Sequence, residues 1–92
     1  MNLGMDFDGQ SVIVTGGATG IGEACCHLFA QSGADVTVMD INREGAEKVA
    51  GDVTAKGGKA VASVVDLTDF DATTEAIDEV NGRAGKIDVM VH

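Results

Sequence analysis

Four short runs of apolar residues recur along the chain, and each is followed by a polar or glycine-containing segment. The runs are SVIVT (11–15), VTVM (36–39), AVASVV (60–65) and IDVMV (87–91). They are largely continuous rather than strictly alternating, which is typical of strands buried on both faces of a parallel sheet. The pattern therefore predicts four buried strands.

The segments between these runs have apolar residues at helical spacing. Helices are expected from about Gly20 to Ser32, from Asn42 as cap to the Gly57-Gly58 pair, and from Thr68 or Asp69 as cap to Gly85. The expected buried faces are Ile21, Ala24, Cys25, Leu28 and Phe29 in the first helix; Ala46, Val49, Ala50 and Val53 in the second; and Ala76, Ile77, Val80 and Ala84 in the third.

Strands that alternate with helices at this pitch predict an α/β fold with a parallel sheet. We expect one Rossmann-like, βαβαβαβ half-domain over residues 1–92, truncated after the fourth strand, with strand order 3-2-1-4. Right-handed crossovers place the first two helices on one face of the sheet and the third on the other. Such a sheet has one incompletely covered face, so strands 1 and 4 are expected to expose Val and Ile and to promote dimerisation or aggregation.

A glycine-rich turn, TGGATGIG (15–22), joins the first strand to the first helix. We expect Gly16 to allow the tight turn, Gly20 to let the backbone approach a pyrophosphate, and Gly22 to allow close packing of the helix. The free N–H groups and the positive dipole end of that helix would then face the phosphates. The turn predicts a dinucleotide site, although a glycine turn without any ligand is the structural alternative.

A nucleoside-triphosphate P-loop is a second alternative for this turn, because Gly17 and Gly22 have the outer spacing of that motif. The motif continues with Lys and then Ser or Thr, whereas Glu23 and Ala24 follow here. The P-loop alternative is therefore excluded.

Asp40 ends the second strand, 24 residues after Gly16. This is close to the spacing at which an acid accepts hydrogen bonds from the adenosine ribose in dinucleotide-binding folds. A carboxylate there repels a 2′-phosphate, which favours NAD over NADP. Arg43 keeps the NADP alternative open because its side chain has the length to reach a phosphate, and a solvated strand end is the structural alternative for Asp40.

Asp66 ends the third strand and is followed by Leu67. Because the carboxyl ends of parallel strands meet at one edge of a sheet, Asp66 is expected near the same crevice. Its carboxylate would accept a hydrogen bond from the adenine amino group, and the N–H of Leu67 would donate to the ring. Helix capping by the DLTD stretch (66–69) is the alternative.

The charge balance narrows the range of partners. The net charge is −9 and the six Lys and Arg residues form no basic stripe, which argues against nucleic acid and anionic membranes. No apolar run has the length of a membrane span and no signal peptide is recognisable, so a cytoplasmic location is expected. Cys25 and Cys26 are adjacent and lack the spacing of a disulfide framework or a metal site; reduced helix residues are expected, with a redox role as the alternative.

The segments TGGATGIG (15–22), Asp40, DLTD (66–69) and IDVMV (87–91) together resemble the short-chain dehydrogenase/reductase family, from Asp6 onward and in the family's order. The resemblance implies an NAD(P)-dependent alcohol/ketone oxidoreductase. The residues it assigns to the pyrophosphate side of the cofactor are Gly16, Thr19, Gly20, Ile21 and Gly22. It further assigns Asp40 to the ribose and Asp66 with Leu67 to the adenine. His92 stands where the family has the first Asn of Asn-Asn-Ala-Gly.

The family's Ser, Tyr and Lys catalytic residues lie beyond strand 4, and this sequence contains no tyrosine. We therefore assign no catalytic residue and no metal ligand. Three hypotheses remain: a cofactor module completed by a further segment or another chain, an NAD-binding fragment without turnover, and an assembly piece without a working ligand site. A homo-oligomer or association with a missing C-terminal half is the expected assembly.

Overall fold

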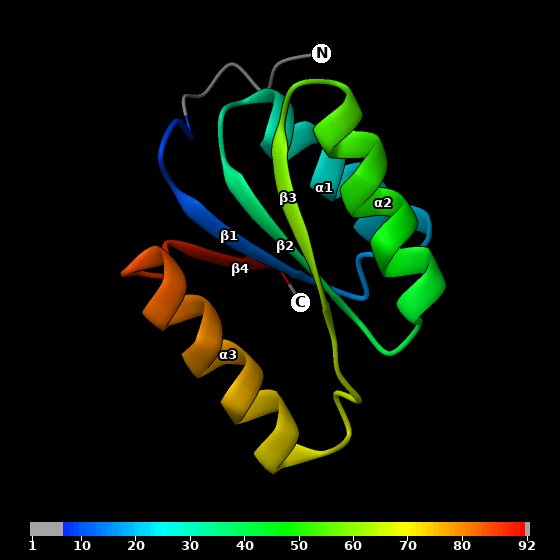
Figure 1. The fold of residues 1–92 in the computed structure, drawn as a ribbon, viewed down its shortest axis with the longest axis vertical. Helices are drawn as coiled ribbons and strands as arrows, with labels where there is room; N and C mark the ends of the chain where they lie inside the picture. The colour runs from blue at the N-terminus through cyan, green and yellow to red at the C-terminus, as the bar shows by residue number, and fades with distance from the viewer. Residues whose placement is uncertain (1–6, 92) are drawn as a thin grey trace.

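The computed structural model describes residues 7–91 and consists of one parallel sheet with three helices (Figure 1). The elements, in chain order, are β1 (Ser11–Thr15), α1 (Gly20–Gln31), β2 (Asp35–Asp40), α2 (Arg43–Ala55), β3 (Lys59–Val64), α3 (Phe70–Ala84) and β4 (Val89–Val91). The strand order is β3-β2-β1-β4 and all pairs are parallel, as predicted. β2 and β3 lie on one side of β1 and β4 on the other, so right-handed crossovers place α3 on the face opposite α1 and α2.

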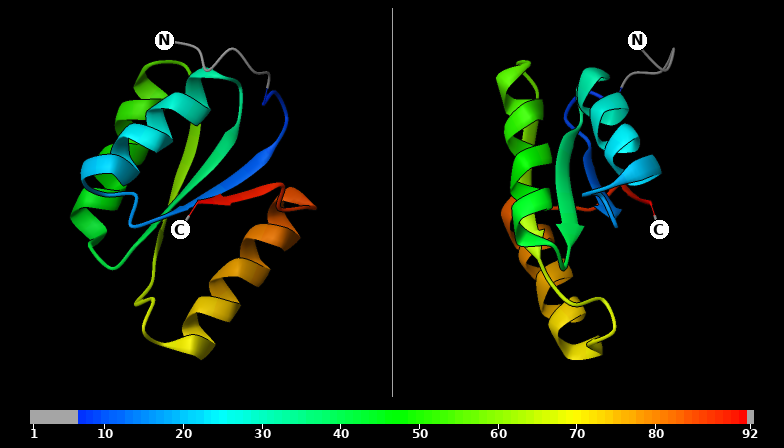
Figure 2. Two further views of the ribbon diagram at one scale, coloured as in Figure 1. Left: turned by 180° about the vertical axis from the view of Figure 1, so that it is seen from behind. Right: turned by 90° about the vertical axis from the view of Figure 1, so that its right-hand side faces the viewer.

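The hydrophobic core has two layers, one on each face of the sheet. On one face, α1 and α2 cover alternate strand residues, with Val12, Val36 and Val38 completely buried. On the other face, α3 covers Ile13 and Met39 through Val80. Figure 1 shows α3 on the opposite side of the sheet from α1 and α2, and the left view of Figure 2 shows the same separation from behind.

The predicted buried face of the second helix is confirmed, and that of the third is confirmed except for Ala84, which is partly exposed. In the first helix the prediction is right for Cys25 and Phe29, which pack on the core, and wrong for Ile21 and Ala24, which are exposed. Ala46, Val49, Ala50 and Val53 are buried in α2, and Val80 is buried in α3, with Ala76 and Ile77 packed on the same cluster. In α1, by contrast, Ile21 is 85% exposed and Cys26 is completely buried. The close approach of Gly22 to the preceding turn sets the rotation of this helix, so the residue one position after Cys25 faces the sheet.

The cap of the third helix was left open between two residues, and the structure selects Asp69. Its carboxylate oxygen Oδ1 accepts a hydrogen bond from the N–H of Ala72 at 3.0 Å. Asn42 caps α2 as predicted, since its Oδ1 accepts from the N–H of Gly45 at 3.1 Å. Gly85 ends α3 in the left-handed conformation, with φ of 80°.

The expected exposure of β1 is wrong. Its residues from Ser11 to Val14 are buried because β2 and β4 flank the strand and helices cover both faces. In β4, Met90 is 44% exposed. This strand is also shorter than predicted, because residues 87 and 88 precede it. Asp88 is instead bonded to Ser11 in two ways. The N–H of Ser11 donates to Oδ2 of Asp88 at 2.8 Å, and the N–H of Asp88 donates to the carbonyl of Ser11 at 2.9 Å.

A long-range side-chain contact attaches the end of α3 to the sheet. Nη2 of Arg83 donates to the hydroxyl of Thr37 at 3.1 Å, and Thr37 is a 1%-exposed residue of the central strand β2. A buried hydroxyl without a partner would be costly. The contact therefore satisfies Thr37 and fixes where α3 crosses the sheet.

Candidate functional site

The glycine turn between β1 and α1 has the backbone conformation that its sequence predicts. Gly16 and Gly20 have positive φ values of 65° and 56°, a region that residues with a Cβ adopt only with strain. A Cβ built on Gly20 meets no other atom within 4 Å, so this side of the turn faces open space. The N–H of Gly16 donates to the carbonyl of Met39 at 2.8 Å and so fixes the turn against the end of β2.

At two other positions of the turn, Gly17 and Gly22, glycine is required because neighbouring atoms leave no room for a Cβ, and not because φ is positive. A Cβ on Gly22 would collide with the carbonyl oxygen of Gly16, which is backbone and therefore has little freedom to move away. A Cβ on Gly17 would lie 2.9 Å from Cγ1 of Val38 and 3.1 Å from Sγ of Cys26. The role expected for Gly22, close packing of the helix, is confirmed, although its neighbour is the turn itself rather than the sheet.

The first turn of α1 presents backbone N–H groups at the surface. Thr19 is the N-cap residue, and its side chain makes no capping hydrogen bond. The first N–H groups of an α-helix have no partner within the helix, and the helix dipole adds partial positive charge at this end. Thr19, Gly20 and Ile21 are all exposed, so these groups are accessible to an anion.

Asp40 is bonded on both sides of its carboxylate. Oδ2 accepts from the N–H of Ala18 at 3.1 Å, and Oδ1 accepts from the N–H of Asn42 at 3.0 Å. The side chain therefore links the glycine turn to the start of α2, and Asp40 is more than a solvated strand end. It is partly buried, and each oxygen retains a lone pair for a further donor.

Asp66 lies just beyond β3, at the same edge of the sheet as Asp40, because the N–H of Val65 donates to the carbonyl of Asp40 at 3.0 Å. Its Oδ1 accepts from the N–H and the hydroxyl of Thr68 at 2.9 and 2.7 Å. The hydroxyl bond and then the backbone bond lower the pKa of Asp66, so this carboxylate is ionised at neutral pH. The capping alternative holds only in part: Asp66 forms a turn with Thr68, while Asp69 caps α3.

Two residues at this edge, Ile41 and Gly45, were not expected there from the sequence. Ile41 follows Asp40 and is 64% exposed, an apolar side chain beside a pair of acids. Gly45 lies inside α2, and a Cβ there would lie 3.0 Å from Cβ of Ala18, so this glycine lets α2 approach the glycine turn. The position of Ile41, directly after the acid that ends a strand, could have indicated its place at this edge. Nothing in the sequence indicated the role of Gly45.

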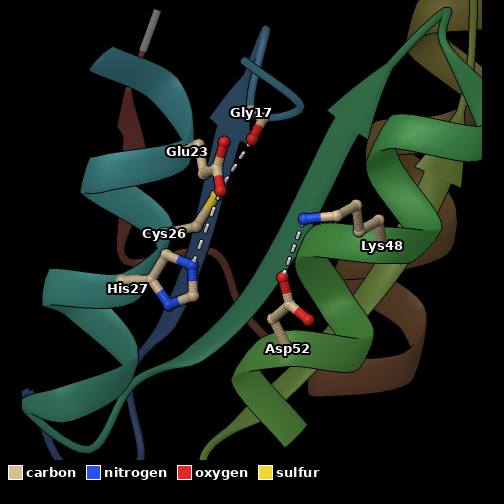
Figure 3. Close-up of polar contacts among 6 residues, drawn as sticks. All are labelled: Gly17, Glu23, Cys26, His27, Lys48 and Asp52. Atoms are coloured by element: carbon tan, nitrogen blue, oxygen red, sulfur yellow. Dashed lines mark hydrogen bonds and ion pairs between the residues drawn. The ribbon is translucent and has the colours of Figure 1, made fainter. Parts of the chain in front are cut away.

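Cys26 contacts the glycine turn from beneath (Figure 3). Its thiol donates to the carbonyl of Gly17 at 3.8 Å, and burial, more than the nearby Cys25 and Glu23, raises its pKa to about 12. A protonated, completely buried thiol is a poor nucleophile. The group is therefore a packing element beneath the turn.

We expect a maleimide to modify Cys25 but not Cys26 in the folded chain near neutral pH, because Cys25 is partly exposed. Mass spectrometry after brief labelling should find one modified thiol, and labelling in denaturant should find both. Rapid modification of Cys26 in the native chain would show that the turn opens above it.

Residues 7–91 contain neither a metal-binding cluster nor a membrane-spanning helix. No group of three or more His, Cys, Asp or Glu side chains there has the geometry to hold a metal ion. None of the described helices has both the length and the apolar character that a membrane crossing requires.

Comparison with known proteins agrees with the geometry. The sequence model of the short chain dehydrogenases matches residues 10–92. A short chain dehydrogenase/reductase of Colletotrichum higginsianum is 37% identical over 84 residues, which is 91% of this chain and 31% of that protein. The 3-oxoacyl-(acyl-carrier-protein) reductase of Thermotoga maritima is 36% identical over 88 residues, 96% of this chain and 36% of the reductase.

Solved structures show the same architecture. A 7α-hydroxysteroid dehydrogenase in complex with NADH and 7-oxo glycochenodeoxycholic acid superposes with a TM-score of 0.88 at 34% identity, over 92% of this chain and 33% of the other. The chain thus spans about a third of the length of the proteins that it matches.

Proposed function

The chain belongs to the short chain dehydrogenase family, and from this premise we propose that its glycine turn and strand-end acids bind the adenosine diphosphate part of NAD(H). The observation that carries the proposal is the meeting of three features at one sheet edge: the accessible amides that open α1, Asp40 and Asp66. In this arrangement the pyrophosphate lies against the N-terminus of α1, and Gly16, Thr19, Gly20, Ile21 and Gly22 form that side of the site.

The acidity of the chain supports backbone recognition of the pyrophosphate. With a net charge of −9, the site has few cationic side chains to offer a dinucleotide. Backbone N–H groups at a helix N-terminus bind phosphate without them. The open space beside Gly20 is the place where a phosphate oxygen approaches the chain most closely.

Asp40 accepts hydrogen bonds from the hydroxyl groups of the adenosine ribose in this proposal. Its two hydrogen bonds to backbone N–H groups hold the carboxylate in place while lone pairs remain for the hydroxyls. A 2′-phosphate beside this carboxylate is repelled, so we propose NAD rather than NADP as the preferred cofactor. Arg43 is exposed at the start of α2 and is the residue through which NADP would bind if this preference is wrong.

Asp66 and Leu67 complete the adenine end. Asp66 is a carboxylate at neutral pH, and because both bonds from Thr68 go to Oδ1, Oδ2 is the acceptor for the adenine amino group in this proposal. Leu67 and Ile41, both exposed, offer apolar contact to the ring faces. We include Ile41 in the proposed site because it is exposed and directly follows Asp40.

In the complete family members the bound nicotinamide supplies a hydride donor or acceptor for an alcohol or ketone. Residues 7–91 supply the adenosine end of that machinery, and we propose that turnover requires further residues. Titration of NADH fluorescence with the chain tests the binding, since an assembly piece would leave the fluorescence unchanged. Addition of NAD and simple secondary alcohols then distinguishes a completed active site from a binding fragment without turnover.

We expect Gly20→Ala to weaken NADH binding by about tenfold or more, because the added Cβ enters the space of the pyrophosphate and disturbs a charge-assisted hydrogen bond. Gly57→Ala is the matched control: Gly57 also has positive φ, 88°, and open surroundings, but it lies after α2, away from the turn. Both variants should lose about 1 kcal/mol of stability from backbone strain. Equal NADH affinities in the two variants, measured by fluorescence titration, would remove Gly20 from the site.

A further inference from the structure

The outer edge of the sheet at β3 is open and lacks the usual features that discourage pairing. β3 pairs only with β2, and six residues of it, Lys59–Val64, run along this edge. Edge strands are commonly protected by proline, bulges or several charges. Here the chain contains no proline, and Lys59 is the single charged residue within β3.

The backbone of β3 offers hydrogen-bonding groups outward. The N–H of Val65, just past the strand, donates to β2 at the carbonyl of Asp40. Because bonding to one neighbour alternates along a parallel strand, Ala60, Ala62 and Val64 direct their N–H and C=O groups away from β2. These groups form a template for one more extended segment.

A hollow lies on each side of this edge. The first is a shallow depression of about 650 Å³, widely open to solvent, between α2 and β3. It is lined mainly by small residues: Ala50, Gly51, Thr54, Ala55, Ala60, Val61 and Ala62, with Glu47. The second, about 450 Å³, lies between β3 and α3. Three carboxylates line the second hollow, those of Asp66, Glu75 and Glu79.

The two hollows match the alternation of side chains along an extended segment. Successive side chains of a strand point to opposite faces of the sheet. In β3 itself, Ala60 and Ala62 pack on the core beneath α2, while Val65 packs on the core beneath α3. A segment added beside β3 therefore sends alternate side chains toward the small-residue hollow and toward the carboxylate hollow.

We propose that β3 is a docking edge for an extended segment of a partner protein in which apolar and basic residues alternate. The apolar side chains enter the hollow beside α2, and the Lys or Arg side chains meet Asp66, Glu75 and Glu79. Charge complementarity selects this occupant, because a second copy of a chain with net charge −9 would bring acids to acids. A bound metal ion does not account for the carboxylates, since no described cluster has metal-binding geometry. Asp66 is shared with the proposed adenine site, so the variants that test this proposal change Glu75 and Glu79 and leave Asp66 as it is.

The test uses a fluorescein-labelled six-residue peptide of alternating valine and lysine, added to the 92-residue chain and followed by fluorescence anisotropy. We expect saturable binding that weakens as salt is added, since exposed charges are screened. A peptide of alternating valine and glutamate should not bind. Equal binding of the acidic peptide, or no binding of the basic one, would overturn the proposal.

Variants of the chain locate the binding. The double variant Glu75→Gln, Glu79→Gln should bind the basic peptide about tenfold more weakly, and this binding should depend less on salt. Asp71→Asn with Asp78→Asn makes the same charge change on the same helix outside the hollow, and should weaken the peptide much less. Equal losses in the two double variants would show only general attraction to an acidic surface and would overturn the assignment to β3.

Ala62→Pro removes an outward N–H without removing a bond to β2, and proline is tolerated at such edge positions. We expect this variant to bind the peptide about fivefold more weakly, which is the effect of one lost hydrogen bond. If this variant does not fold, a peptide N-methylated at alternate residues tests the same hydrogen bonds on the wild-type chain and should bind poorly. Undiminished binding of the methylated peptide, or self-association through β3 in place of peptide binding, would contradict the proposal.

Discussion

Gly22→Val should largely unfold the chain, with an expected loss of about 3 kcal/mol or more in the free energy of unfolding. The Cβ of any larger residue would collide with the carbonyl oxygen of Gly16 and approach the Cα of Gly17, and both are backbone atoms of a tight turn. Relief of the collision requires α1 to move away from the turn. That movement would separate Cys26 from the core that it completes with Val14 and Val38.

Gly51→Ala is the matched control for this variant. Gly51 also lies in a helix, α2, but a Cβ there meets nothing within 4 Å. Because alanine is the better helix former by about 1 kcal/mol, this control should be neutral or stabilising. Urea denaturation followed by circular dichroism measures both. A Gly22→Val chain as stable as the wild type would show that α1 does not lie against the turn as described.

Asp40→Ala should lower the affinity for NADH by about tenfold to a hundredfold, which is the range expected for loss of hydrogen bonds to a charged group. The variant also releases the N–H groups of Ala18 and Asn42, so part of the loss comes from a less ordered glycine turn. The affinity for NADPH should fall less than that for NADH, because removal of the carboxylate also removes the repulsion of the 2′-phosphate of NADPH. The ratio of the two affinities therefore shifts toward NADPH.

Two further variants separate the causes of that shift. Asp40→Asn removes the charge but keeps a carbonyl oxygen that accepts from a backbone N–H, so it isolates the electrostatic part of the preference. Asp52→Ala removes an acid from the exposed surface of α2, where it pairs with Lys48 at 3.3 Å, and should leave both affinities unchanged. If Asp40→Ala has the same NADH-to-NADPH ratio as the wild type, Asp40 does not contact the ribose.

Much of the fold followed from local patterns. Continuous apolar runs predicted all four strands, and helical spacing predicted the buried residues of α2. The failures occurred where a local pattern competes with a distant contact. Ile21 has the spacing of a buried residue, yet the contact of Gly22 with Gly16 rotates α1 so that Ile21 faces solvent.

The end of the apolar run at 87–91 illustrates the same limit. Ile87 and Asp88 belong to the run, but the carboxylate of Asp88 takes the place of a strand partner for Ser11 and β4 begins one residue later. The expected exposure of β1 was wrong for a related reason. The pattern shows that a strand is apolar but does not show how completely α3 covers it, and this coverage comes from packing between distant segments, such as that of Val80 with Ile13 and Met39.

The sequence by itself determined the order of elements and the strand order, and it predicted the place of the site. Each of these depends on local periodicity, glycine conformation and the handedness of the crossovers, which act over a few residues at a time. Only the tertiary structure decided that Asp40 holds the glycine turn through Ala18, that Gly45 makes room for that turn, and that Ile41 lies exposed beside the acids. These features arise between segments far apart in the chain, and a contact of that kind has no signature in the residues on either side of it.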